Sequence, residues 1–479
     1  MTDSGYQSPL GTRYASPAMQ QLWGEAHRVA LWRRLWLALM ETERELGLEI
    51  PAAAVAELQA HLDDADLAAA AQYERRFRHD VMAHIHAMGD QAPAARPFIH
   101  LGATSAFVTD NADLMVMREG MRLLLGRLVA LLRALGAFAS RHAGLPCLAY
   151  THFQPAQLTT VGKRATLWAQ DLALDVGALC HRVEALPFLG CKGTTGTQAS
   201  FLELFHGDHG KVRELDRRIA ERMGFGRAFP VSGQTYPRKT DSMVLDALSG
   251  VAQSASKLAS DLRLLQHEGE LLEPFESEQI GSSAMAYKRN PMRAERIGSL
   301  ARFLISLPQN TAHTAAAQWL ERTLDDSANR RLVLPEAFLA ADAILILAVN
   351  IVTGLEVREP VIARHVAEQM PFMATERWMM LGVEAGGDRQ ALHETIRTES
   401  MAVASRVAAG EPNDLLERLA ARPAFSRVPV ATLRAELDPA RYTGRSAAQV
   451  AEFLEESLGP AIARAAALAA PATGGEVRV

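Results

Sequence analysis

The chain has 479 residues, of which 48% are hydrophobic and only 6% are aromatic, and its formal net charge is −5. This balance excludes a protein that coats nucleic acid without sequence preference, because such a protein would need a basic surface. A few local arginines can still bind a small anion. Because Ala and Leu supply much of the apolar content and favour helices, we expect a mostly helical protein with a large core. Three cysteines without CxxC spacing indicate a reducing compartment, and the N-terminus lacks the apolar run of a signal peptide, so we expect a soluble, cytoplasmic protein.

The predicted elements change in character along the chain. The first hundred residues combine short helical stretches with turns. From Asp110 to about His142, apolar residues recur at steps of three and four, which predicts one long helix. Comparable long helices are predicted over Gln157–Leu186, Asp241–His267, Pro291–Leu307 and Pro335–Leu355. After Pro360 the helices shorten, and we expect a loose tail from Pro471 to Val479.

Long helices of this kind pack side by side in a bundle. The most apolar stretch, Ala337 to Val352, is interrupted by Asp342 and Asn350, so it predicts a buried helix rather than a membrane span. This stretch is apolar on more than one face and must be covered on several sides. We therefore predict a homo-oligomer in which bundles pack against each other.

Three polar, glycine-containing loops separate the predicted helices: LGATSAFVTDN at 101–111, KGTTGTQASF at 192–201 and GSSAMAYKRNP at 281–291. Each is either a solvated connection or part of a site. All three contain more hydroxyl groups than a helix-to-helix link requires, and hydroxyl and backbone N–H groups are what an anionic ligand needs.

The third loop contains the clearest local signal. Asn290 as N-cap and Pro291 at the first helical position predict a helix start whose free N–H groups point toward Ser282. Lys288 and Arg289 add positive charge to the same loop. The segment therefore predicts a site for a carboxylate that gains negative charge during a reaction.

This third loop resembles the GSSxMPxKxNP signature of the fumarase/aspartase superfamily. The segments KGTTGTQASF, THFQPAQLTTVGKR, RTLDDSANRR and PFMATE are similar to the adenylosuccinate lyase branch, and the resemblance extends from SPLGTRYASPAM to FLEE. It implies an all-α, three-region fold: an N-terminal helical domain (1–104), a central long-helix bundle (105–357) and a small C-terminal helical domain (358–479). It also implies a homotetramer with a many-helix core and active sites built from three subunits. Ala286 stands where the family has proline, so we expect a more mobile loop.

Enzymes of this branch release fumarate from a succinylated purine nucleotide, without a metal or an organic cofactor. The elimination needs a base, stabilisation of the aci-carboxylate that forms, and an acid for the departing nitrogen. The resemblance implies Ser282 as the base, and His152 as the acid with Glu295 as its partner. It assigns Lys288 to the charged carboxylate and His79 to assisting the acid. Two alternatives remain open: Ser282 as a simple carboxylate ligand, and Glu295 as an ordinary first-turn glutamate.

Specificity for a nucleotide requires a phosphate site, for which the candidates are Arg13, Tyr14, Arg322, Ser327 and Arg331. For each arginine, surface ion pairing is the alternative. The other substrate contacts that the resemblance implies are Arg78, His79, Asp80, Thr104, Ser105, Thr151, Gln234, Lys288, Asn290 and Arg296.

Histidines 79, 84 and 86 do not predict a metal site. His79 and His84 are five residues apart and do not share a helical face, and no HExxH motif accompanies them. We therefore expect His84 and His86 to be structural.

Two other functions remain open at this point. One is the same elimination acting on argininosuccinate, malate or a carboxymuconate. The arginines of the predicted phosphate site are evidence against this alternative. The other is a non-enzymatic helical scaffold, which the fold permits but which has no need of His152, Ser282, Lys288 and Asn290 together. The predicted partner is a small purine nucleotide rather than a nucleic acid or a membrane.

Overall fold

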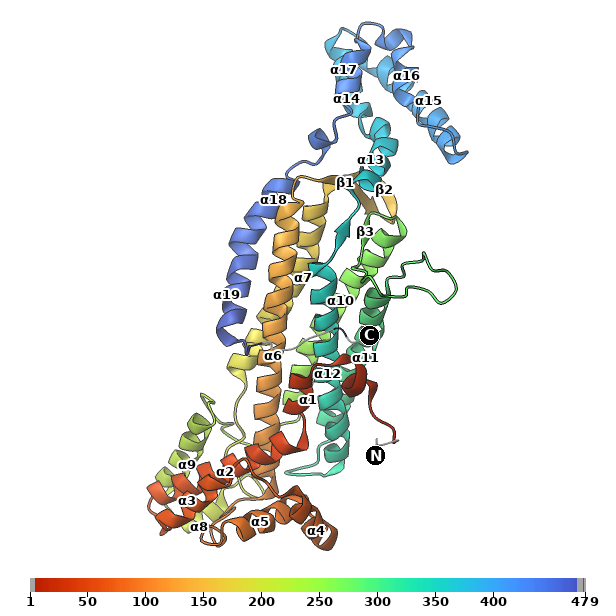
Figure 1. The fold of residues 1–479 in the computed structure, drawn as a ribbon. Helices are drawn as coiled ribbons and strands as arrows, with labels where there is room; N and C mark the ends of the chain where they lie inside the picture. Colours follow the sequence, from red (N-terminus) through yellow and green to blue (C-terminus); the bar gives the residue numbers. More distant parts are fainter. Residues whose placement is uncertain (1–4, 472–476, 478–479) are drawn as a thin grey trace.

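The computed structural model describes residues 5–471 and 477, so most of the expected tail at 471–479 lies outside the described residues. The described chain is elongated, with a central bundle of long helices and groups of shorter helices at both ends (Figure 1). This architecture confirms the predicted all-α fold class.

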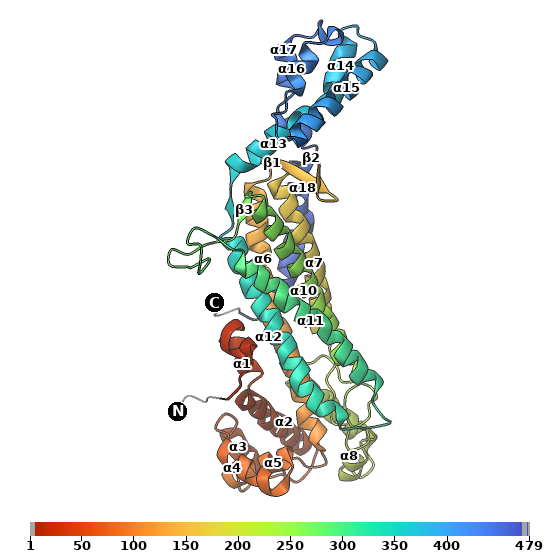
Figure 2. The same ribbon diagram turned by 90° about the vertical axis from the view of Figure 1, so that its right-hand side faces the viewer.

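Long helices run side by side through the central bundle in both views (Figures 1 and 2). They are α6 (Ser105–Arg141), α7 (Val161–Ala185), α10 (Lys239–His267), α11 (Met292–Ala316) and α12 (Asp325–Thr353). The predicted stripe of α6 is buried, for example at Leu114, Leu124 and Leu131. Burial of this apolar face stabilises a helix that would be marginal alone in water.

Shorter helices pack at the end of the bundle where α6 begins (Figure 1). They include the N-terminal helices α2 (Glu25–Glu45), α3 (Ala52–Ala60), α4 (Leu67–Phe77) and α5 (Asp80–Gln91). The preceding elements η1 (Leu10–Tyr14) and α1 (Pro17–Leu22) lie along the side of the bundle, where both pack on α12. Two helices from the middle of the sequence, α8 (Ala199–Leu204) and α9 (His209–Arg222), lie at the same end as α2, and α9 packs on α2.

The other end of the molecule contains α13 (Glu359–Met373), α14 (Thr375–Glu384), α15 (Arg389–Ala408), α16 (Leu415–Ala420) and α17 (Val430–Ala435). These helices enclose a small core of their own around Trp378 and Phe425. The chain then returns, so that α18 (Ser446–Phe453) packs on α7 and α19 (Gly459–Leu468) packs on α6 and α7. The domain boundaries after residues 104 and 357 stay predictions.

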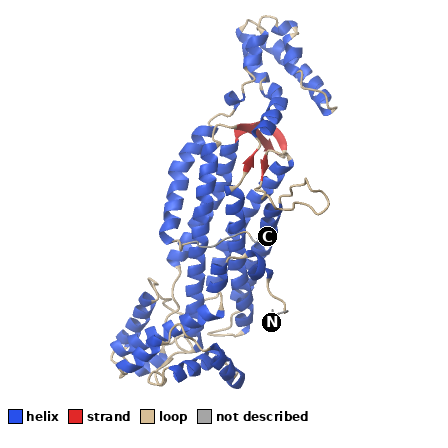
Figure 3. Cartoon of the chain, viewed as in Figure 1, coloured by secondary structure: helices blue, strands red, loops and turns tan. Residues whose placement is uncertain are grey.

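Two short antiparallel pairs of strands lie near the junction of the bundle and the C-terminal helices (Figure 3). Strand β1 (Pro146–Thr151) pairs with β2 (Gln154–Thr160), and β3 (Leu271–Leu272) pairs with β4 (Glu356–Val357). The first pair corrects the predicted helix Gln157–Leu186, because residues up to Thr160 are a strand. The helix begins after Thr160, whose hydroxyl accepts a hydrogen bond from the Lys163 N–H at 3.1 Å and caps α7.

Two predicted helix boundaries at prolines are also wrong. Helix α11 continues through Pro308, and α12 begins ten residues before Pro335. An internal proline removes one backbone hydrogen bond. In α12 the turns before Pro335 stay helical because buried ion pairs hold Asp326 and Arg330 in place.

The apolar helix predicted at Ala337–Val352 lies inside the bundle, as expected. By length and hydropathy, α6 and α12 would each be long enough to cross a membrane. However, 67% and 72% of their most apolar windows are buried inside the protein, as in the core helices of helical bundles.

Candidate active site

A cavity of about 760 Å³ lies where α5, α6 and α12 begin. Nine of the predicted site residues line it: Arg78, His79, Asp80, Thr104, Ser105, Gln234, Arg322, Ser327 and Arg331. These residues come from four separate stretches of sequence. The fold therefore brings nine of the predicted substrate contacts around one pocket of a size suited to a small ligand.

His79 is held at the wall of this cavity by local backbone geometry. Arg78 ends α4 in the left-handed conformation at φ 56°, and His79 is the N-cap of α5. Its Nδ1 accepts a hydrogen bond from the Met82 N–H at 3.4 Å, while Nε2 lies 3.3 Å from the Ser105 hydroxyl. In the tautomer that accepts at Nδ1, the His79 ring carries a proton on Nε2 and can donate it beside Ser105.

Asp80 and Arg331 form an ion pair on the same wall. The Arg331 guanidinium donates to the Asp80 carboxylate at 2.8 Å, and the Val81 N–H donates to its other oxygen at 2.8 Å. Although burial opposes the shift, these hydrogen bonds lower the pKa of Asp80. The pair therefore stays charged at neutral pH and restricts the position of Arg331, one of the phosphate candidates.

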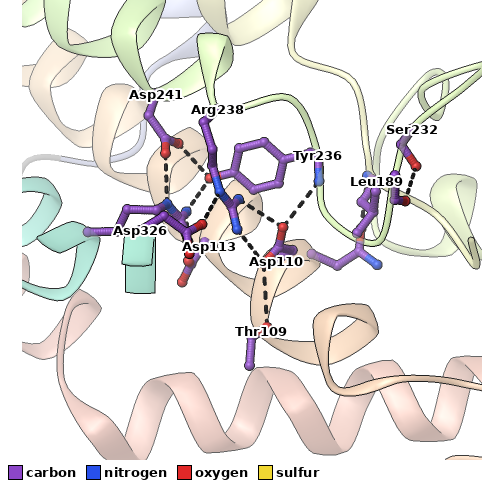
Figure 4. Close-up of polar contacts among 12 residues, drawn as sticks. Thr109, Asp110, Asp113, Leu189, Ser232, Tyr236, Arg238, Asp241 and Asp326 are labelled. Carbon is purple, nitrogen blue, oxygen red and sulfur yellow. Dashed lines mark hydrogen bonds and ion pairs between the residues drawn. The ribbon is translucent and has the colours of Figure 1, made fainter. Parts of the chain in front are cut away.

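A network of buried charges forms the inner wall of the cavity (Figure 4). Arg238 donates to both oxygens of Asp110 at 2.8 and 3.2 Å and to Asp326 at 2.6 Å. The second oxygen of Asp326 accepts from Arg322 at 2.8 Å. Asp326 thus connects the phosphate candidate Arg322 to the interior of the bundle.

Arg330 forms the second half of this network. It donates to Asp241 at 2.7 Å and to Asp113 at 2.9 Å, and it also contacts the hydroxyl of Tyr236. Burial raises the pKa of Asp113 and raises that of Tyr236 well above its usual value. The sequence pattern did not predict any of these residues as part of the site. The available signal was the presence of charged residues at or near the starts of helices whose inward positions are otherwise apolar, as in VTDNAD and YPRKTD.

The Ser282 loop forms a second, separate group of predicted residues. The Ser282 hydroxyl oxygen accepts from the N–H groups of Ala284 at 3.3 Å and Met285 at 3.2 Å. The loop closes at Gly281, where a Cβ atom would lie 2.1 Å from the Lys288 carbonyl oxygen, so only glycine fits. The side-chain amide of Asn290 donates a hydrogen bond to the Gly281 carbonyl at 2.7 Å and stabilises this closure of the loop.

The predicted helix start beside this loop is wrong in detail. Helix α11 begins at Met292, and Asn290 does not cap it. Instead, the buried carboxylate of Glu273 accepts from the N–H groups of Arg293 and Ala294, both at 3.0 Å. These first-turn donors are therefore already paired, because a carboxylate is the preferred partner of a helix N-terminus. The N–H groups near Ser282 come from its own loop.

Glu295 and Arg296 lie at the start of α11. The Arg296 guanidinium lies 5.7 Å from the centre of the Tyr14 ring. The element η1, which contains Arg13 and Tyr14, therefore lies next to the start of α11. Glu295 is half exposed, and its carboxylate lies 4.0 Å from Arg263. Within one chain, the neighbour of Glu295 is therefore Arg263 and not His152, the partner that the resemblance implies.

His152 lies at the tip of the hairpin formed by β1 and β2. Thr151 pairs with Gln154, so His152 and Phe153 form a two-residue turn with φ values of 52° and 57°. Such turns normally contain glycine or asparagine, because positive φ is strained for other residues. Thr151 and His152 are exposed and lie outside the lining of the cavity that contains His79. Within one chain, the predicted residues therefore form three separate groups. They lie at the His79 cavity, at the Ser282 loop with the start of α11, and at this hairpin.

The remaining histidines of the N-terminal region pack against aromatic rings. The His84 ring meets Trp32 edge-on at 5.4 Å, and His86 lies against Tyr73 and Phe77. Within residues 5–471 and 477, no group of three or more His, Cys, Asp or Glu side chains is arranged to hold a metal ion. These packing contacts agree with structural roles for His84 and His86.

Comparison with known proteins gives two family matches. Residues 43–304 match the family described as "Lyase", and residues 371–453 match the family described as "Adenylosuccinate lyase C-terminus". The chain is 48% identical over 469 residues to an adenylosuccinate lyase of Schizosaccharomyces pombe, with 97% of each chain covered. It is also 48% identical over 461 residues to an adenylosuccinate lyase of Saccharomyces cerevisiae, with 95% of each covered.

Two solved structures share the fold at low sequence identity. A 3-carboxy-cis,cis-muconate lactonizing enzyme from Pseudomonas putida superimposes with a TM-score of 0.79 at 23% identity, covering 95% of this chain and 98% of that one. A fumarate lyase from Mesorhizobium sp. BNC1 gives a TM-score of 0.78 at 22% identity, covering 93% and 98%. These two likenesses support the bundle architecture alone.

Proposed function

Because the chain belongs to the adenylosuccinate lyase family, we propose that it releases fumarate from adenylosuccinate, giving AMP, and from succinylaminoimidazole carboxamide ribotide, giving AICAR. The chain is a lyase of the fumarase/aspartase superfamily. The proposal includes a role in purine synthesis in the cytoplasm. The observation that carries it is the cavity in which nine predicted substrate contacts meet.

In the proposed mechanism, Ser282 removes a proton from the succinyl carbon next to a carboxylate. The electrons of that C–H bond pass into the carboxylate, which becomes the doubly charged aci-carboxylate near Lys288 and Asn290. Their return forms the C=C bond of fumarate and expels the nitrogen, which His152 protonates. The two N–H groups that donate to the Ser282 oxygen support this role, because they would stabilise negative charge on that oxygen.

The nucleotide part of the substrate is assigned to the cavity. Arg322 and Arg331 offer forked donors for phosphate, and both are restrained by carboxylates, at Asp326 and Asp80. Ser105, at the start of α6, and His79, at the start of α5, lie together in the lining of the same cavity. His79 assists the acid in this proposal, since its Nε2 lies beside Ser105 at the lining of the cavity, where it can donate to a substrate oxygen in place of the Ser105 hydroxyl.

We further infer that the active enzyme is a homotetramer whose sites combine residues from neighbouring subunits. One chain holds His152, the Ser282 loop and the His79 cavity in separate places, and a complete site needs all three. Large apolar side chains are also exposed on the bundle helices: Leu174 on α7 is 70% exposed and Leu332 on α12 is 69% exposed. Packing of bundles against each other would cover these side chains.

The proposed reaction is tested by incubating the purified protein with adenylosuccinate. We expect equimolar AMP and fumarate, measured by ultraviolet absorbance and chromatography. Argininosuccinate, malate and a carboxymuconate serve as comparison substrates, for which we expect no turnover because they lack a nucleotide phosphate for Arg322 and Arg331. Turnover of any of these instead of adenylosuccinate would contradict the proposed substrate.

Shared active sites predict complementation between two inactive variants. His152→Ala and Ser282→Ala are each expected to be inactive, whereas mixed tetramers regain intact sites because each variant supplies the group that the other lacks. With random mixing, about a quarter of the sites should be intact if the two groups come from different subunits. The measurement is fumarate release after mixing, unfolding and refolding the two variants together. If one subunit supplied both groups, the mixture would stay inactive.

A further inference from the structure

The Ser282 loop projects from the side of the bundle between β3 and α11 (Figures 1 and 2). Its tip makes few contacts within the chain, and Ile280 and Tyr287 are 77% and 84% exposed. The geometry of Ser282 and Lys288 therefore depends on how the two ends of the loop are fixed to the bundle. At the first end, Glu273 binds the N-terminus of α11.

Arg289 fixes the second end, directly after Lys288. Its guanidinium donates to the Glu356 carboxylate at 2.8 and 3.5 Å and lies 4.9 Å from the centre of the Phe275 ring. Its carbonyl oxygen accepts from the Gln266 side chain at 3.0 Å. Arg289 is thus held through both its side chain and its backbone, by residues from three separate segments.

Glu356 belongs to the small β3–β4 pair rather than to the loop. It pairs with Leu272 at the position where the chain leaves β3 for the loop. The hydrogen bond from Arg289 is the main cause that lowers the pKa of Glu356, so the carboxylate remains charged. Arg358 also donates to Glu356, at 3.1 Å, but it makes this contact from outside the loop.

We propose that Arg289 and Glu356 are positioning residues that hold the Ser282–Lys288 segment in the geometry used for elimination. This inference rests on the proposed function, because it takes Ser282 and Lys288 as reacting groups. Arg289 is turned toward Glu356, so it acts through its neighbours rather than on the substrate. A partly exposed ion pair adds little to overall stability, so its main effect is on the loop.

The test is Glu356→Gln, which preserves shape and removes the charge. We expect kcat for adenylosuccinate to fall about tenfold, while KM stays within about threefold and the melting temperature is nearly unchanged. Arg289→Lys should lie between this variant and the wild type. The charge-swapped double variant Arg289→Glu/Glu356→Arg should recover part of the lost kcat, because it restores the attraction between the same two positions.

Arg358→Gln is the matched control, because it removes the other partner of Glu356 without touching the loop. We expect its kcat to stay within about twofold of the wild type. An unchanged kcat in Glu356→Gln, an equal loss in Arg358→Gln, or no recovery in the double variant would each overturn the proposal.

A second readout separates this inference from the proposed function. Chymotrypsin cleavage after Tyr287, followed by mass spectrometry, reports the freedom of the loop without any turnover. Glu356→Gln should be cleaved faster than the wild type, and Arg358→Gln should not. Failure of the wild type to release fumarate would refute the function, whereas equal cleavage of all three proteins would refute the positioning role.

Discussion

Ser282→Ala is expected to abolish turnover, lowering kcat on the order of a thousandfold, within the range attributed to a general base. The serine oxygen accepts two backbone N–H groups, from Ala284 and Met285, which would stabilise its anionic form. Alanine removes the oxygen and these two hydrogen bonds, but it leaves the closure of the loop at Gly281 and Asn290 in place. Substrate binding should therefore remain close to that of the wild type, as measured by isothermal titration calorimetry with the inactive variant.

Ser283→Ala provides the matched control for this prediction. Ser283 is the neighbouring hydroxyl and is exposed, whereas Ser282 is half-buried. We expect Ser283→Ala to weaken binding of the substrate carboxylate more than it lowers kcat. If Ser282→Ala instead lost binding and kept kcat at saturating substrate, Ser282 would be a carboxylate ligand, and the base would have to be another group.

Arg238→Met is expected to lower the free energy of unfolding by about 3–5 kcal/mol, the usual effect of removing one partner of a buried ion pair. Arg238 is buried and forms ion pairs with Asp110 and Asp326, both of which are also buried. Methionine fills much of the same space but offers no guanidinium to the Asp110 carboxylate. The cavity should also lose affinity for nucleotide, because Asp326 would no longer be held in place under Arg322. Urea unfolding and AMP binding measure the two effects.

The pH dependence of this variant follows from the same contacts. Although burial opposes the shift, Arg238 is the main group that lowers the pKa of Asp326. The wild type therefore gains stability from this carboxylate at neutral pH and loses it as pH falls through the lowered pKa. Because Arg238→Met lacks most of this gain, we expect its deficit relative to the wild type to shrink as pH falls below about 4, the usual pKa of an aspartate.

Arg217→Met is the control for Arg238→Met. Arg217 also contacts two carboxylates, those of Glu214 and Glu221, but on the solvent-exposed face of α9. Water screens these pairs, so we expect little change in stability. A similar loss in both variants would mean that burial is not what makes the Arg238 network important.

The sequence predicted features that depend on neighbouring residues. The apolar stripe of α6 and the pattern of α10 appear in consecutive turns, so their periodicity predicts both helices to within a few residues. The pattern did not predict β2, because strand pairing with β1 outweighs the preference of Gln157–Thr160. It also predicted a helix that ends at Leu307, although α11 continues through Pro308 to Ala316.

For the candidate site, the sequence alone indicated the type of chemistry, through the hydroxyl-rich loops and the signature around Ser282. Only the tertiary structure decided which groups meet. Asp110 and Arg238 lie 128 positions apart, and the carboxylate that binds the start of α11 comes from Glu273, about 20 positions earlier. Periodicity depends only on residues that are close in the sequence. The partner of a buried charge depends instead on how the helices pack against each other. For the same reason, only the folded chain reveals that His152, Ser282 and the His79 cavity lie apart within one subunit.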